Sequence, residues 1–147
     1  MKEIIPMASD HAGYELKLKV KKLLEDKGFE VIDYGTNSTE SCDYPDFAHQ
    51  VGRVINNGTY ARGIVICGSG EGVSMTVNKY PNVRCGLCWE KEIAHLVRQH
   101  NNANVLAMPA RFISEELAFE IVSEFFTTEF EGGRHIRRVE KISQLLK

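Results

Sequence analysis

Short runs of apolar residues alternate along the chain with longer stretches in which apolar residues recur at helical spacing. Runs of this kind, rich in Val and Ile and bounded by polar residues or glycine, predict β-strands. Strands are expected at residues 4–8, 30–34, 63–67, 83–88 and 104–108. Six helices are expected. The first ends near Gly28, the second runs from Pro45 to Gly58, and the third is short and follows a glycine loop after residue 67. The fourth includes Ile93 to Val97, the fifth spans about 114–127, and the last spans about 132–147.

The predicted strands are apolar on both faces, and crossover helices separate them. Such strands suit a parallel sheet that helices cover on each side. The expected fold is therefore α/β: a three-layer α/β/α sandwich around a doubly wound, five-stranded parallel sheet of Rossmann-like type. Residues 1–147 are expected to form a single domain, since no linker or repeat divides them. Pro6 cannot donate a ladder hydrogen bond, so a bulge or a lost hydrogen bond is expected in the first strand.

The composition is that of an ordinary globular protein without a dominant charge. Of the 147 residues, 43% are hydrophobic and 26% are charged, and the formal net charge is -2. This balance gives no global attraction to nucleic acid or to an anionic membrane, so neither is expected as a partner. No apolar run approaches the roughly 20 residues of a membrane span. The first residues also lack the apolar core of a signal peptide, which makes a cytoplasmic location the default expectation.

The cysteines suit a reducing compartment. Four cysteines are too few for a secreted disulfide scaffold, so free thiols are expected. Cys85 and Cys88 are three apart in a predicted strand and would point to opposite faces of the sheet. They would therefore neither chelate together nor form a redox motif, and no metal site is expected.

Ligands of open parallel sheets bind beyond the carboxyl ends of the strands. The polar segments expected at that edge are residues 9–13, 43–44, 67–73 and 109–111. Cys67 stands between a strand and a loop that opens a helix, where unpaired N–H groups and the helix dipole favour a thiolate. Such a thiolate can act as a base or a nucleophile. A cysteine at a buried strand end can equally be a small core residue, and position alone leaves both interpretations open.

The loop Gly68-Ser-Gly-Glu-Gly72 allows the backbone to approach a ligand closely and to direct several amides at one oxygen. An anion or an enolate is its natural guest. A nucleotide P-loop is not supported because no lysine occurs before Lys79, and a phosphatase loop would need arginine at Val73. A dinucleotide loop would need glycine at Val73, but Glu90 roughly meets its second requirement. A nucleotide-binding module therefore remains an alternative.

Arg134, Arg138 and Lys141 share one face of the last predicted helix. They could form a solvated basic face. Arginines four apart at a helix start can also grip a phosphate, and the two interpretations weigh about equally. His100 ends the helix before the last strand and is expected near the catalytic edge, where a histidine can exchange protons near neutral pH. His11 is expected at that edge as well.

Seven short motifs follow one another along nearly the whole chain. They are Ser9-Asp-His-Ala-Gly13, Asp43-Tyr-Pro45, Ile66-Cys-Gly-Ser-Gly70, Asn78-Lys79, Arg98-Gln-His-Asn101, Asn104-Val-Leu-Ala107 and Glu131-Gly-Gly-Arg-His135. Together they resemble the motifs of type B ribose-5-phosphate isomerase and of the related galactose-6-phosphate isomerase subunits. The resemblance implies an aldose–ketose isomerase that converts a sugar phosphate through an enediolate, as in the pentose phosphate pathway. It implies no metal, nucleotide or other cofactor.

The resemblance also implies roles for individual residues. Cys67 resembles the base that moves a proton between carbons 2 and 1, and Ser69 resembles the hydroxyl that assists transfer between the oxygens. His100 and Asp10 resemble the pair that opens the furanose ring. The implied substrate contacts are the anion-hole amides of Gly68, Gly70, Glu71, Gly72 and Val73, the phosphate-binding side chains of His11, Arg111, Arg134 and Arg138, and the further contacts Tyr44 and Asn101.

Members of this family build their sites across a dimer interface, which implies a homodimer or a dimer of dimers. His100, Asn101 and Arg111 would then serve the catalytic cysteine of the other subunit, and the last helix would pack on that subunit. Ser69 departs from the threonine of many members, and Val73 occupies the position at which some members carry a glutamate base. The substrate stays open between ribose 5-phosphate and a six-carbon allose or galactose phosphate.

Overall fold

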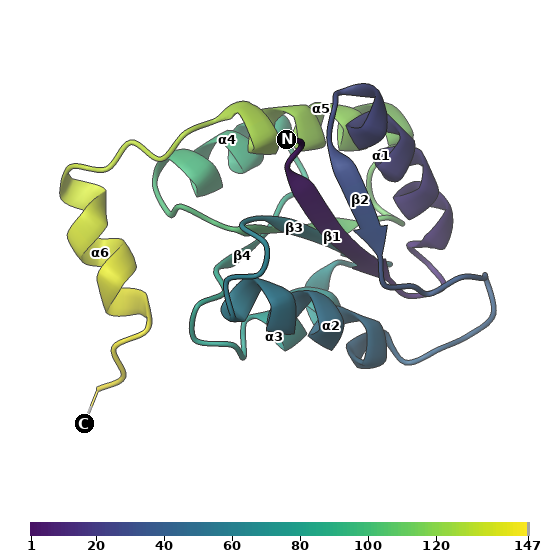
Figure 1. Cartoon of the computed structure of the whole chain (residues 1–147), viewed down its shortest axis with the longest axis horizontal. Coiled ribbons are helices and arrows are strands. Elements are labelled where there is room, and N and C mark those ends of the chain that lie inside the picture. Colours follow the sequence, from purple (N-terminus) through teal and green to yellow (C-terminus); the bar gives the residue numbers. More distant parts are fainter. Residues whose placement is uncertain (147) are drawn as a thin grey trace.

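The structure, a computed structural model, describes residues 1–146. Strands and helices alternate along the chain (Figure 1). The strands are β1 (Ile4–Ser9), β2 (Glu30–Asp33), β3 (Gly63–Cys67), β4 (Cys85–Leu87) and β5 (Val105–Pro109). The helices are α1 (Tyr14–Asp26), α2 (Tyr44–Asn56), α3 (Glu71–Val77), α4 (Lys91–Gln99), α5 (Glu115–Thr127) and α6 (Arg134–Ile142). Of these helices, none is both long and apolar enough to cross a membrane.

The strands form one five-stranded parallel sheet in the order β2-β1-β3-β5-β4. From β1 the chain steps outward to β2 through α1, and it then returns past β1 to β3 through α2. The direction of winding therefore reverses between β1 and β3. Their carboxyl ends form the topological switch point at which open α/β sheets bind ligands. This doubly wound parallel sheet confirms the expected fold class.

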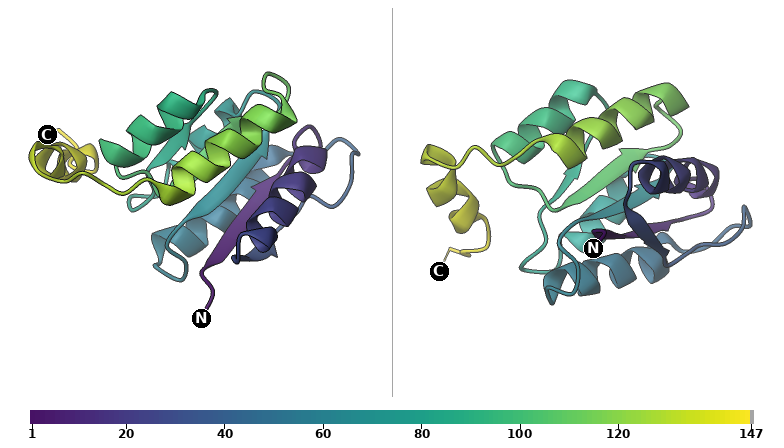
Figure 2. Two further views of the ribbon diagram at one scale, coloured as in Figure 1. Left: turned by 90° about the horizontal axis from the view of Figure 1, so that it is seen from above. Right: turned by 45° about the horizontal axis from the view of Figure 1, so that its top comes forward.

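Helices cover both faces of the sheet. α1, α4 and α5 lie on one face, and α2 and α3 lie on the other (Figures 1 and 2). Successive side chains of β3 alternate between the two cores, because strand side chains point to opposite faces. Ile64 and Ile66 pack with α1, α4 and α5, whereas Val65 and Cys67 pack with α2 and α3. Cys67 therefore reaches the edge of the sheet on the side from which α3 begins.

Helix α6 stands apart from the three layers, beyond one end of the sheet (Figures 1 and 2). Ser143, which follows the helix, donates a hydrogen bond from Oγ to Pro81 O at 2.8 Å and ties it to the body. The apolar side chains of Ile136 and Ile142 are 47% and 56% exposed. Exposed apolar side chains on an amphipathic helix indicate that this chain alone does not supply the surface on which the helix packs.

Two local expectations are wrong, and of the two alternatives for Pro6 only the bulge is. β4 is shorter than residues 83–88, because as an edge strand it pairs with β5 alone. The last helix ends at Ile142, and the exposed Leu146, which continues its apolar periodicity, lies beyond it. Pro6 causes no bulge, since β1 pairs with β2 in unbroken register. On its other side β1 pairs with β3 only from Met7 onward, so the missing donor of Pro6 falls at the end of that ladder.

Candidate active site

Cys67 lies at the carboxyl end of β3, beside the end of β1. Its carbonyl accepts a hydrogen bond from Ala110 N at 2.9 Å, and the residue is only 5% exposed. The loop that opens α3 follows directly. Cys67 is therefore separated by three residues from the first turn of α3, whose N–H groups have no partner within the helix.

The chain around the start of α3 is packed so closely that two of its positions, Gly70 and Gly72, have no room for a side chain. Gly70 has a φ of 75°, in the left-handed region. A Cβ at Gly70 would overlap the Leu87 side chain and lie 3.1 Å from the backbone carbonyl carbon of Met108. A Cβ at Gly72 would lie 2.5 Å from the ring of Tyr44. Tyr44 thus covers the loop, and the absence of a side chain at Gly72 allows the backbone to lie directly against the ring of Tyr44.

The remaining loop positions differ in what they can offer to a ligand. Ser69 and Glu71 are exposed, and Ser69 Oγ accepts a hydrogen bond from Glu71 N at 3.3 Å. Val73 is 1% exposed and belongs to the core beneath α3. Its side chain therefore packs inward, and only its N–H is left to contribute to an anion hole.

Arg111 lies at the Cys67 edge of its own chain. Its N–H donates to Gly68 O at 3.0 Å, and a Cβ at Gly68 would lie 3.2 Å from Arg111 Nη1. The guanidinium group thus lies against the glycine loop and faces solvent on its other side. Arg111 therefore reaches the loop of its own chain, whereas the resemblance implied that it serves another subunit.

β1 delivers Asp10 and His11 to the same edge. Asp10 is 8% exposed, its N–H donates to Ile66 O at 3.2 Å, and its Oδ1 accepts from Gly13 N at 3.0 Å. The carboxylate thereby holds the turn that leads into α1. His11 Nδ1 accepts a hydrogen bond from Cys42 N at 3.3 Å. Because Nδ1 accepts, the neutral ring carries its proton on Nε2, from which it can donate to a ligand.

His100 lies at the opposite edge of the sheet from Cys67 in the same chain. It follows α4 and leads to Asn104, whose carbonyl accepts a hydrogen bond at 2.9 Å from Gly63, the first residue of β3. The length of β3 separates the two edges by on the order of 13 Å. The expectation that His100 lies near the catalytic edge of its own chain is therefore wrong. A crossover helix returns the chain to the edge of the sheet at which the strands begin. His100 is the residue at which α4 ends, so it lies at that edge.

Asn101, Arg134 and Arg138 accompany His100. Asn101 is the next residue, and a hydrogen bond of 3.0 Å from Glu131 N to Gln99 O joins the segment before α6 to the end of α4. Both arginines are exposed on α6. The expected site residues thus form two groups, one at the carboxyl ends of β1 and β3 and one at the end of α4 and on α6.

A sequence profile of the ribose/galactose isomerase family matches residues 5–142. The chain belongs to this family. Ribose-5-phosphate isomerase B of Escherichia coli is 43% identical over 141 residues, which cover 96% of this chain and 95% of that protein. The crystal structure of a ribose 5-phosphate isomerase from Thermotoga maritima has a TM-score of 0.95 and 49% identity, and the match covers 99% of this chain and 100% of that one. Ribose-5-phosphate isomerase B from Mycoplasma genitalium with bound ribulose 5-phosphate has a TM-score of 0.94 and 42% identity, over 98% and 96% of the two chains.

Glu131 and His135 were missed by sequence reasoning as neighbours of His100 in this isomerase. The rings of His100 and His135 stack with centroids 4.4 Å apart and planes at 15°. Glu131 Oε2 lies 3.8 Å from His100 Nε2 and 3.7 Å from His135 Nε2. Burial, and then the nearby His100, lower the pKa of His135, which favours its neutral form. The motif around Arg134 pointed to this segment, but nothing in the sequence pattern links it to His100.

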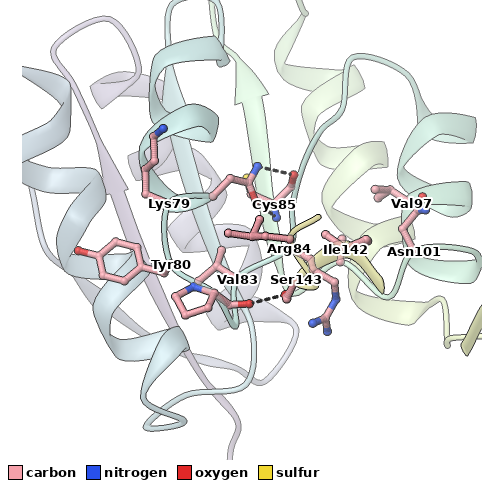
Figure 3. A pocket seen from close by; sticks show the side chains of 13 residues that line it. Lys79, Tyr80, Val83, Arg84, Cys85, Val97, Asn101, Ile142 and Ser143 are labelled. Atoms are coloured by element: carbon pink, nitrogen blue, oxygen red, sulfur yellow. Dashed lines mark hydrogen bonds between the residues drawn. The ribbon is translucent and has the colours of Figure 1, made fainter. Parts of the chain in front are cut away.

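A cavity of about 520 Å³ lies between α6 and the segment that joins α3 to β4 (Figure 3). Its walls include Tyr80, Val83, Arg84 and Ile142, and Asn101 is the one expected site residue that borders it. The Cys67 edge contributes nothing to its lining. The cavity is therefore separate from the Cys67 edge, and residues at the end of α6 form one of its walls.

Cys85 and Cys88 face opposite sides of the sheet, as the sequence predicts. Cys88 packs in the core under α1, α4 and α5, and Cys85 packs against the core on the other face. Burial raises the pKa of each thiol to about 12. Both therefore stay protonated near neutral pH, and neither is suited to act as a base.

Proposed function

We propose that this chain interconverts D-ribose 5-phosphate and D-ribulose 5-phosphate. Two relatives that match nearly its whole length are named ribose-5-phosphate isomerase B, and one of them has ribulose 5-phosphate bound. The observation that carries the proposal is the end of β3, where a thiol, a glycine turn and the start of a helix meet at the switch point of the sheet. That arrangement combines a base with backbone donors for a developing oxyanion.

The proposed reaction begins when the thiolate of Cys67 takes the proton from carbon 2 of the open-chain aldose. The electron pair of that C–H bond forms the double bond between carbons 1 and 2, and the carbonyl electrons move onto oxygen 1. Backbone N–H groups of the loop stabilise the resulting enediolate, and one such donor typically contributes about 3 kcal/mol. Cys67 then returns the proton to carbon 1, while the hydroxyl of Ser69 assists proton transfer from oxygen 2 to oxygen 1, and the ketose results.

The phosphate group anchors the substrate in the proposed site. His11 and Arg111 bind it from the chain that provides Cys67, and Arg134 and Arg138 bind it from a second copy. Guanidinium groups suit phosphate because they donate paired hydrogen bonds in a planar fork. Their binding energy holds the sugar in register without contact to the reacting carbons.

Ring opening precedes isomerisation, since a furanose has no free carbonyl. His100 from the second copy, together with Asp10, transfers the protons that open the ring. Tyr44, which covers the glycine loop, and Asn101, which follows His100, contact the sugar hydroxyls. The backbone amides of Gly68, Gly70, Glu71, Gly72 and Val73 complete the contacts at the oxyanion.

A homodimer with α6 packed on the partner subunit brings the two groups of residues together. Within one chain, His100 and Cys67 lie at opposite edges of the sheet. Ile136 and Ile142 on α6 are about half exposed, and Phe112, which follows Arg111, is 76% exposed. A two-fold symmetric dimer would bury such side chains and form two equivalent sites, each from both copies.

The proposal is tested with Cys67→Ala and, as a matched control, Cys88→Ala. Loss of the base should lower kcat by at least about 10²- to 10⁴-fold, while binding of ribulose 5-phosphate, measured by calorimetry, stays close to that of the unmodified chain. Cys88→Ala removes a protonated thiol from the core and should lower stability without a comparable loss of kcat. Full activity in Cys67→Ala would end the assignment of the base.

The family also includes galactose isomerases, so a six-carbon substrate is the second candidate. Rates of the purified chain on ribose 5-phosphate, allose 6-phosphate and galactose 6-phosphate decide between them. We expect the highest kcat/KM on ribose 5-phosphate. A higher value on either six-carbon phosphate would change the substrate and leave the proposed chemistry at Cys67 in place.

A further inference from the structure

The three side chains at the start of α6 form a compact set of potential metal ligands. His100 comes from the end of α4, Glu131 from the connection after α5 and His135 from the first turn of α6. One ligand atom from each lies within 4.8 Å of those of the other two. Glu131 Oε2 faces both imidazole Nε2 atoms, at 3.8 Å and 3.7 Å. Segments far apart in the sequence therefore converge on a single point.

His135 supplies an independent indication of a ligand. The residue is 6% exposed, and its buried Nε2 has no hydrogen-bond partner among residues 1–146. The carboxylate of Glu131, at 3.7 Å, is too distant to serve as one. An unsatisfied buried nitrogen is destabilising, so a ligand that occupied this position would recover the lost interaction.

We propose that His100, Glu131 and His135 bind a divalent transition-metal ion of the Zn²⁺ class, and that the bound ion inhibits the isomerase. Two imidazoles and one carboxylate form a common ligand set for Zn²⁺, with a fourth position open to water. Tetrahedral coordination at about 2.0–2.1 Å needs ligand atoms about 3.4 Å apart, a few tenths of an ångström closer than Glu131 Oε2 now lies to each ring. The two imidazole rings are stacked, so their Nε2 lone pairs run parallel and do not point at one ion. The ring of His100 must therefore rotate until its Nε2 lone pair points toward the same ion as that of His135.

The two more exposed ligands make this adjustment accessible. The side chain of His100 is 37% exposed and that of Glu131 is 51% exposed, so both can move and an ion can enter from solvent. His135, by contrast, is fixed in the interior. The ion would clamp the start of α6 against the end of α4.

Inhibition follows from the role of His100. An imidazole nitrogen that coordinates a metal ion has no lone pair for proton transfer, so the bound ion would block ring opening. This inhibitory part rests on the proposed function, whereas metal binding itself does not. The metal site shares His100 with the proposed ring-opening step, but the ion takes no part in the proton transfers at Cys67.

Binding is tested directly on the full-length protein with Co²⁺ and Zn²⁺ under reducing conditions. We expect one ion per chain by calorimetry, with visible Co²⁺ absorption but no thiolate-to-cobalt charge-transfer band. Glu131→Gln and His135→Asn should each weaken binding by at least about 10- to 100-fold, the loss that even an outer-shell change typically causes. His95→Asn is the matched control, because His95 Nδ1 contacts Glu124 Oε1 at 2.7 Å but is not among the three clustered ligands. It should leave binding unchanged.

Three results would overturn metal binding at this site: no saturable binding, a thiolate band, or equal affinity in Glu131→Gln and the unmodified chain. His135→Asn changes a buried residue, so circular dichroism must show a folded chain. Glu131→Gln, at a half-exposed position, keeps the test decisive if His135→Asn does not fold.

Inhibition is tested by Zn²⁺ titration of isomerase activity, followed by chelation. The unmodified enzyme should lose activity at the Zn²⁺ concentration at which calorimetry shows binding, and should recover it with EDTA. Glu131→Gln, compared with its own metal-free rate, should need at least about 10-fold more Zn²⁺. Full isomerase activity in a protein whose metal site is saturated with Zn²⁺ would overturn the proposed inhibition but not metal binding. A metal-free chain without isomerase activity would overturn the proposed function and leave metal binding standing.

Discussion

Around the loop after β3, side chains press against the backbone, whereas around α6 apolar side chains face solvent. No Cβ fits at Gly70 or Gly72 without a clash, and Cys67 is nearly buried. Ile136 and Ile142, on α6, are each about half exposed. These two regions carry the two groups of proposed site residues. One group is thus fixed by packing within the chain, and the other stands on a helix that the chain does not itself enclose.

The contrast gives each region a different part in catalysis. Donors held by tight packing need no reorganisation when charge develops, so in the proposed reaction the loop is preorganised for the enediolate. In the proposed dimer, the arginines of α6 acquire a fixed position when the helix packs on the other copy. Activity should therefore depend on dimer formation, and hence on protein concentration, even though the base and the anion hole lie in a single chain.

Mixing two inactive variants tests this division most strongly. Cys67→Ala and His100→Asn should each lose at least about 10²-fold in kcat, measured on the furanose substrate. After unfolding and joint refolding, about half of the dimers should contain one chain of each kind. Each mixed dimer has one site with an intact Cys67 and an intact His100, so the mixture should regain about a quarter of the unmodified rate.

The control for this experiment is a mixture of Cys67→Ala with the double variant Cys67→Ala/His100→Asn. No dimer in that mixture contains Cys67, so no activity should return. If the first mixture also stays inactive while native mass spectrometry, with one variant isotopically labelled, shows mixed dimers, each site lies within one chain and the division between the two regions is wrong.

Tight packing of the loop is tested by Gly70→Ala against Gly58→Ala. Both glycines have a positive φ, 75° and 79°, but a Cβ at Gly58 would have nothing within 4 Å. Gly58→Ala should cost only the backbone strain of about 1–2 kcal/mol in the free energy of unfolding. Gly70→Ala should add an overpacking cost of about 1–3 kcal/mol and lower kcat by about 10²-fold, because the loop amides are displaced. Equal losses in urea unfolding would show that the loop has room.

The loop region was largely predictable because local sequence patterns determine it. The apolar run at 63–67 predicts β3 with the bounds that the structure has, Gly63–Cys67. The glycines that follow predict a close approach of the backbone to a ligand, which stays a prediction; within the chain, Gly70 packs closely against Leu87. A strand and a tight turn each depend on a few consecutive residues, so the amino-acid sequence alone is enough to predict them.

The α6 region was less predictable because it depends on contacts between distant segments. His100 was expected at the catalytic edge, but the order of β5 and β4 in the sheet and the return of α4 place it at the other edge. The contact of His100 with Glu131 and His135 joins segments that no periodicity connects. The apolar spacing predicted that the last helix continues to Leu146, but α6 ends at Ile142. Residues 143–146 keep the apolar spacing without being helical.

The proposed role of α6 predicts a smaller effect for Arg138→Ala. A hydrogen bond to a charged group typically contributes about 1.5–3 kcal/mol, so KM for ribose 5-phosphate should rise about 10- to 100-fold. Arg137→Ala is the matched control, because this exposed neighbour points about 100° around the helix and should change KM less than about 2-fold. Equal effects of the two variants would mean that α6 contributes only its general positive charge.

The smallest expected effect concerns Cys85 and Cys88, at the edge strand that borders α6. Their pKa values of about 12 leave roughly one thiolate in 10⁴ at pH 8, so iodoacetamide should label them very slowly in the folded protein. Labelling should speed up about tenfold for each unit of pH, because the thiolate fraction rises in that proportion below the pKa. Mass spectrometry of digested samples measures each site, and the more accessible Cys42 is the internal reference. Rapid labelling of Cys85 but not of Cys88 at pH 8 would show that β4 opens in solution, which would extend the loosely packed region from α6 into the sheet.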